Sequence, residues 1–111
     1  MQSTEALDRT FQALSNPTRR AVVERLGRGA CSVSELAEPF GMALPSFMQH
    51  LEVLEECGLV RSYKRGRVRT VEVRPAQLKR ASRWLEKQQQ LWARRLDQLD
   101  DYLTKMDKES E

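Results

Sequence analysis

Apolar residues recur at intervals of three and four along the first half of the chain and again along its last third. This spacing places apolar side chains on one face of an α-helix. Over the first half of the chain it predicts four helices. They run over residues 5–14, from Pro17 to Gly27 or Gly29, from Ser32 to about Pro39, and over residues 44–58.

Two of these helices begin with residues that suit a helix N-terminus. Asn16 can accept a hydrogen bond from a free backbone N–H, and Pro17 follows it at a position that needs no N–H. Ser32 and Glu35 fit a capping box, in which each side chain satisfies one free donor. The fourth helix carries an apolar stripe for the core, formed by Leu44, Phe47, Met48, Leu51 and Leu54. Two helices joined by a short Gly-containing turn predict a helix-turn-helix over residues 32–58.

Short runs of β-branched and aromatic residues replace the helical spacing over residues 59–74. They flank Arg65-Gly66-Arg67, where Gly66 can supply the positive φ of a tight turn. This segment predicts a β-hairpin that ends at Pro75.

A long helix is predicted from residue 76 to residue 106, with Leu78, Leu85, Trp92 and Leu99 at seven-residue steps. Its length of about 45 Å exceeds the span of so small a domain. We therefore expect its apolar stripe to pack on a second copy of the chain. The fold class is mostly α with a small β-hairpin, in the order ααααββα, as a single domain over residues 1–111.

Composition narrows the class of protein. The chain has 111 residues, of which 32% are charged and 40% are apolar, so one compact core is expected rather than disorder or a collagen-like repeat. No apolar run approaches the roughly 18–20 residues that cross a membrane, and the N-terminus lacks signal-peptide features. We expect a cytoplasmic protein with no membrane partner, whose two cysteines stay reduced.

Basic residues are concentrated in one segment. Residues 57–83 contain nine basic side chains and one acidic side chain, Glu72, whereas the segments on both sides carry net negative charge. Such a concentration suits a surface that binds the phosphates of nucleic acid. A solvated charged hairpin is the alternative interpretation.

A polar row on the helix over 44–58 could contact DNA bases. Ser46, Gln49, His50 and Val53 recur at helical spacing away from the apolar stripe. Gln pairs well with adenine, Ser and His meet bases or phosphates, and Val can contact a thymine methyl group. The alternative is a polar face that is merely solvated, but the order of capped helix, turn, helix and basic hairpin favours DNA readout.

Cations near this row are candidates for phosphate contacts. They are Lys64, Arg65, Arg67 and Arg69 of the hairpin, together with Arg19 and Arg20. The last two lie in the first turn of a helix, where positive charge opposes the helix dipole and so needs another reason to be there.

Four segments also carry a pattern known from one protein family. They are Leu14–Arg20, Val33–Ala37, Met42–Val60 and the Arg65-Gly66-Arg67 turn. In these segments, and over about residues 5–103, the chain resembles the ArsR/SmtB family of bacterial winged-helix repressors. The run Gln49-His50-Leu51 with Gly58-Leu59-Val60, and the run Leu14–Arg20, are the most specific matches.

The resemblance implies a winged helix-turn-helix with a β-wing over residues 59–74 and a dimerisation helix over residues 76–106. It implies a homodimer, paired through its first and last helices, that places two recognition helices in successive major grooves of a double-stranded DNA operator and thereby blocks transcription. Whether the repressor also controls its own gene is left open. The residues that we expect at the dimer interface are Leu7, Phe11, Leu85, Trp92, Leu96, Leu99 and Leu103.

The chain departs from the family at both common metal sites. Metal sensors carry a Cys-x-Cys pattern at the third helix, where this chain has Ser32 and Ser34, or Asp and His on the last helix, which here contains no His. We therefore predict no metal site and no cofactor. Ala43 stands where a Ser or Thr cap is common, so the fourth helix is expected to start less firmly.

Other functions stay open at this point. Cys31 and Cys57 suit packing, but either could make the protein a thiol-responsive repressor, and Trp84 with Trp92 could line a small-ligand pocket. A winged-helix protein-interaction module is a further alternative, which the basic wing disfavours. No enzyme is expected, because the chain shows no Gly-rich phosphate loop or catalytic triad, and His50 has no base or orienting partner.

Overall fold

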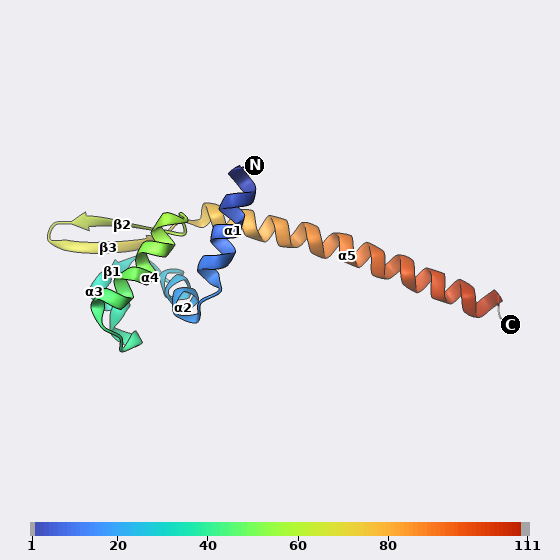
Figure 1. Ribbon diagram of the computed structural model, residues 1–111, viewed down its shortest axis with the longest axis horizontal. Coiled ribbons are helices and arrows are strands. Elements are labelled where there is room, and N and C mark those ends of the chain that lie inside the picture. The colour runs from blue at the N-terminus through green and yellow to red at the C-terminus, as the bar shows by residue number, and fades with distance from the viewer. Residues whose placement is uncertain (1, 110–111) are drawn as a thin grey trace. The chain divides into compact units, whose positions relative to one another are not determined.

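The computed structural model describes residues 2–109, and Figure 1 labels their elements. The elements are α1 (Gln2–Leu14), α2 (Pro17–Leu26), β1 (Cys31–Ser32), α3 (Val33–Ala37), the 3-10 turn η1 (Glu38–Phe40), α4 (Leu44–Glu56), β2 (Val60–Arg65), β3 (Val68–Val73) and α5 (Pro75–Glu109). The predicted mostly helical fold with a β-hairpin is confirmed. Residue contacts divide the chain into two compact units, Met1–Ala81 and Ser82–Glu111.

The helix starts in the first unit follow the sequence pattern. The side chain of Asn16 accepts a hydrogen bond from the backbone N–H of Arg19 at 3.1 Å, directly before Pro17. Oγ of Ser32 accepts from the backbone N–H of Glu35 at 3.2 Å, but the second bond of the predicted capping box, from the Ser32 N–H to the Glu35 carboxylate, is absent among the described residues. Ala43 makes no side-chain capping bond, as its lack of a polar group requires.

The sheet contains a strand that the sequence pattern did not predict. The strand order is β1-β3-β2, and β1 pairs antiparallel with β3 through Cys31 opposite Val71 and Ser32 opposite Thr70. A strand of two residues is too short to show a period of its own. The β2–β3 hairpin turns as predicted, with Gly66 at a φ of +68°.

The core of the first unit is formed by the apolar stripe of α4, by α2 and by the inner face of the sheet. Phe47, Leu51 and Leu54 are fully buried, and α4 packs against α2 and β2. Met48 lies at the edge of this core, partly buried. The prediction for Leu44 was wrong: its side chain, at the first position of α4, is 56% exposed, whereas Phe47 three residues later is buried.

The second unit consists of the part of α5 from residue 82 onward. Its large apolar residues are all exposed in this single chain, and they are Trp84, Leu85, Leu91, Trp92, Leu96, Leu99, Tyr102, Leu103 and Met106. A helix with one exposed apolar face is unstable alone in water and needs a surface to cover it. Among residues 2–109, no helix is long and apolar enough to cross a membrane.

Two leucines of α4 provide a matched test of this core. We expect Leu54→Ala, which empties a fully buried site, to lower the free energy of unfolding by about 2–5 kcal/mol. We expect Leu44→Ala, on the same helix but exposed, to change it by less than about 0.5 kcal/mol. Urea denaturation measures both, and a similar loss for the two variants would contradict this description of α4.

Candidate nucleic-acid interface

The polar row of α4 is accessible because the opposite side of the helix is buried. Phe47, Leu51 and Leu54 point into the core, which leaves Ser46 and Gln49 exposed on the outer side. Both side chains are uncharged, and each can donate and accept hydrogen bonds. This surface suits the reading of base edges.

Val53 is placed differently from the rest of the row. Its side chain is 37% exposed and lines a hollow together with Glu56 and with Arg9, Gln12 and Ala13 of α1. A base contact by Val53 stays a prediction. The sequence pattern did not predict that Val53 would lie beside α1 in this hollow.

His50 is half-buried and has a partner within the chain. Its Nδ1 lies 3.3 Å from Nη1 of Arg19, which is 31 positions earlier. The sequence analysis missed this pair, because only the packing of α2 against α4 brings the two residues together.

Arg19 and Arg20 lie at the start of α2 for a reason that the fold supplies. Nε and Nη2 of Arg19 donate to the carbonyl oxygens of Ala13 and Gln12, and Nη1 of Arg20 donates to that of Leu14 at 2.8 Å. These are the last carbonyls of α1, which have no partner within the helix. The two guanidinium groups thus cap α1. Their contact with DNA phosphates stays a prediction.

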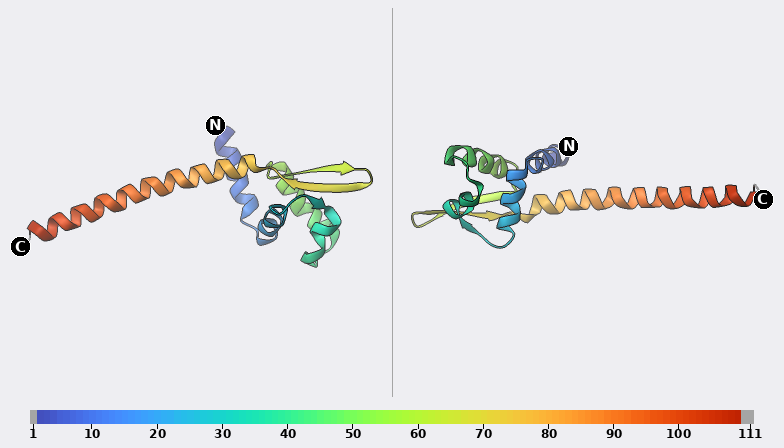
Figure 2. Two further views of the ribbon diagram at one scale, coloured as in Figure 1. Left: turned by 180° about the vertical axis from the view of Figure 1, so that it is seen from behind. Right: turned by 90° about the horizontal axis from the view of Figure 1, so that it is seen from below.

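The wing carries its cations on two faces and at its turn. Residues that lie opposite each other in an antiparallel pair share a face. Lys64 and Arg69 are such a pair, and they share the face of Val71, which is buried in the core. Arg65 lies on the other face, and Arg67 is in the turn. In Figures 1 and 2 the closed end of the hairpin lies beyond α3 and α4. The side chains of these four cations are exposed.

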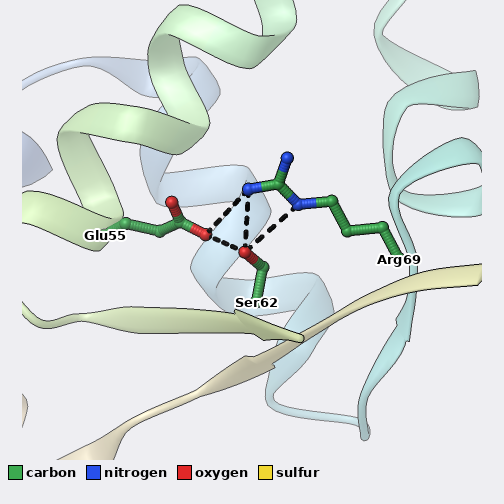
Figure 3. A network of polar contacts seen from close by, with 3 residues as sticks. All are labelled: Glu55, Ser62 and Arg69. Carbon is green, nitrogen blue, oxygen red and sulfur yellow. Dashed lines mark hydrogen bonds and ion pairs between the residues drawn. The ribbon is translucent and has the colours of Figure 1, made fainter. Parts of the chain in front are cut away.

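Arg69 is already paired within the chain (Figure 3). Its Nε and Nη2 donate to Oγ of Ser62 at 3.2 and 3.0 Å, and Nη2 lies 3.7 Å from Oε1 of Glu55. The hydroxyl of Ser62 in turn donates to Oε1 of Glu55. The wing is thus linked to α4 by a network that the sequence analysis missed, because its three residues come from three elements.

A second ion pair holds the other face of the hairpin. Nε of Arg61 lies 2.8 Å from Oε1 of Glu72, directly across the two strands, and its guanidinium lies 5.2 Å from the ring centre of Tyr63. The single acidic residue of the basic segment therefore neutralises Arg61. Among the residues that the structure describes, the wing cations without an ion pair are Lys64, Arg65 and Arg67 near its turn and Arg74 at its base.

Both cysteines are placed for packing. Cys31 is 7% exposed, on the core face of β1. Cys57 is half-buried, and burial raises the pKa of its thiol, so little of the reactive thiolate forms at neutral pH. These observations disfavour the thiol-responsive alternative.

No group of three or more His, Cys, Asp or Glu residues could hold a metal ion within residues 2–109. The side chains expected at the dimer interface differ in burial. Leu7 is half-buried and Phe11 is 36% exposed on α1, whereas Leu85, Trp92, Leu96, Leu99 and Leu103 of α5 are exposed.

Comparison with known proteins bears on what this surface does. The helix-turn-helix domain family matches residues 14–63. The chain is 40% identical over 78 residues to the HTH-type transcriptional regulator Rv2034 of Mycobacterium tuberculosis (strain ATCC 25618 / H37Rv), with 70% of this chain and 73% of the relative covered. It is 30% identical over 60 residues to the transcriptional repressor SdpR of Bacillus subtilis (strain 168), with 54% and 67% covered.

A solved structure is more similar still. The crystal structure of an ArsR family transcriptional regulator superposes with a TM-score of 0.76 at 52% sequence identity, over 81% of this chain and 93% of that chain. The match includes most of the chain of that regulator, so the similarity extends beyond the helix-turn-helix.

Proposed function

Since the chain belongs to the ArsR family of winged helix-turn-helix transcriptional regulators, we propose that it acts as a homodimeric repressor that reads an operator with α4 and holds the DNA backbone with its wing. The chain is a DNA-binding transcription regulator and not an enzyme. The repressor function is supported by the 30% identity to SdpR, whose name describes it as a transcriptional repressor. Occupation of an operator that overlaps a promoter would block transcription, including that of its own gene.

The exposed polar row of α4 is the observation that carries this proposal. A recognition helix must offer side chains that hydrogen-bond to base edges in the major groove while its other side is held in the core. Gln49 fits this requirement best, because it is exposed and can form two hydrogen bonds with adenine. Ser46 and His50 serve as further contacts to bases or nearby phosphates.

The wing supplies affinity that does not depend on base sequence. Arg65 and Arg67 are exposed at the end of the hairpin, and Lys64, also exposed, directly precedes them in β2. Each phosphate that such a cation neutralises releases counterions, which favours binding at low salt. Arg69 contributes less to phosphate binding, because its charge is already opposed by Glu55.

The apolar face of α5 is proposed to pair two copies of the chain. Exposed apolar patches of this extent are rare on monomers. Leu85, Trp92 and Leu99 repeat at seven-residue steps, which is the spacing of helices that pack along each other. A two-fold dimer also matches the two half-sites that helix-turn-helix proteins bind.

Base readout by Gln49 can be tested on two duplexes. We expect Gln49→Ala to weaken binding by about 1–3 kcal/mol to the DNA upstream of the protein's own coding sequence, and to change binding to a shuffled duplex little. Fluorescence anisotropy at near-physiological salt measures both affinities. Equal losses on the two duplexes would exclude Gln49 as a base reader, and equal wild-type affinities would argue against a sequence-specific repressor at this DNA.

The wing cations are expected to differ in their salt dependence. We expect Arg67→Ala to reduce the slope of log K against log salt concentration by about one, because one phosphate contact is lost. Arg69→Ala is the matched comparison and should reduce the slope by less, since Glu55 already opposes its charge. Anisotropy titrations at several salt concentrations give the slopes, and a larger effect of Arg69→Ala would reverse these assignments.

The dimer proposal concerns one face of α5. We expect Leu99→Glu to shift the protein from dimer to monomer, because it places a charge in the apolar stripe. Gln90→Glu places the same charge on the opposite side of the helix and should leave the dimer intact. Sedimentation velocity distinguishes the two, and a wild-type monomer at micromolar concentration would refute the pairing.

A further inference from the structure

Three helices meet at Arg19 and His50. Nε of Arg19 donates to the carbonyl oxygen of Ala13 at 2.7 Å, and Nη2 donates to that of Gln12 at 3.2 Å. The remaining nitrogen, Nη1, lies 3.3 Å from Nδ1 of His50 on α4. Because a guanidinium group is rigid and planar, its two bonds to the end of α1 fix the direction of the donor that faces His50.

This contact determines which nitrogen of the histidine ring carries the proton. A guanidinium group has donors only, so Nδ1 of His50 must act as the acceptor. The neutral ring then carries its proton on Nε2. The contact therefore selects one of the two tautomers of the ring.

The other ring nitrogen faces the solvent. Within residues 2–109, no buried side-chain nitrogen or oxygen lacks a hydrogen-bond partner. Over the same residues, the hydrogen bonds of His50 involve Nδ1 and not Nε2. Nε2 is thus accessible, and its N–H is available to a molecule that binds α4.

We propose that Arg19 is a positioning residue that holds His50 with its proton on Nε2, so that α4 presents a hydrogen-bond donor to DNA at this position. The inference rests on the proposed function, in which His50 contacts DNA. A donor pairs with N7 or O6 of guanine, N7 of adenine, O4 of thymine or a phosphate oxygen, and it does not pair with the amino groups of adenine or cytosine. Arg19 thus restricts the groups of DNA with which His50 can form a hydrogen bond.

The tautomer can be observed directly in the free protein. His50 is the only histidine of the chain, so its two ring nitrogens are assigned without ambiguity. At about pH 8.5, above the ordinary titration range of histidine, long-range ¹H–¹⁵N correlation should show Nε2 protonated and Nδ1 unprotonated. Arg19→Gln should move both nitrogen signals toward those of a mixture of tautomers.

Arg20→Gln is the matched control for this measurement. It removes a cap from the same end of α1, at Leu14, and its side chain is not hydrogen-bonded to His50 within the described chain. We expect it to leave both nitrogen signals at their wild-type positions. A wild-type ring protonated on Nδ1 would overturn the proposal, and so would unchanged signals in Arg19→Gln.

A double-mutant cycle tests the consequence for DNA binding, with the duplex that the wild-type protein selects from a random pool as the probe. Arg19→Gln should weaken binding about three- to tenfold, the effect of one hydrogen bond. In a His50→Gln background the same substitution should cause no further loss, because glutamine offers a donor near the position of Nε2 but no acceptor at that of Nδ1. Equal losses in both backgrounds would mean that Arg19 acts by capping α1 or by its own contact with a phosphate, and not through His50, and would overturn the proposal.

The two proposals can fail separately. If the wild-type protein does not prefer the selected duplex over a shuffled one, the proposed function fails, while the nitrogen signals of the free protein still decide the role of Arg19. If the wild-type protein shows that preference and Arg19→Gln leaves the signals unchanged, only the role of Arg19 fails. If His50→Gln does not bind the duplex, the nitrogen signals of the free protein decide the role of Arg19 in place of the double-mutant cycle.

Discussion

The burial of one side of α4 is the constraint on which the candidate site depends. Phe47, Leu51 and Leu54 have no access to water, and they hold the helix against α2 and the sheet. Successive helix positions turn by about 100°, so fixing this side fixes the direction of every other side chain. Ser46 and Gln49 of the polar row are exposed as a consequence, whereas His50 is half-buried.

Polar contacts then join α4 to its neighbours on two flanks. On one flank, His50 meets Arg19, whose other donors cap α1. On the other flank, Glu55 holds the wing through Ser62 and Arg69. Polar contacts therefore tie α4 both to the end of α1 and to the hairpin.

These contacts also divide the positive charge of the chain into two groups. Of the cations considered for DNA binding, Arg19, Arg20 and Arg69 satisfy carbonyls, a hydroxyl or a carboxylate within the fold, whereas Lys64, Arg65 and Arg67 have no ion pair within the described residues. A count of basic residues treats all of them alike. Among these candidates, the cations without an ion pair lie near the turn of the wing.

The sequence by itself determined the helices, the hairpin and the exposure of Ser46 and Gln49 on α4, because these follow from local spacing, capping residues and one glycine with positive φ. Resemblance to a family added the winged arrangement. Strand β1, the exposure of Leu44, the contact of Arg19 with His50 and the network of Glu55 with Ser62 and Arg69 were decided only by the tertiary structure. The physical reason is the same in each case: a short strand, a covered face or a hydrogen bond between distant residues depends on which surfaces pack together, and that information is not contained in the periodicity of any one segment.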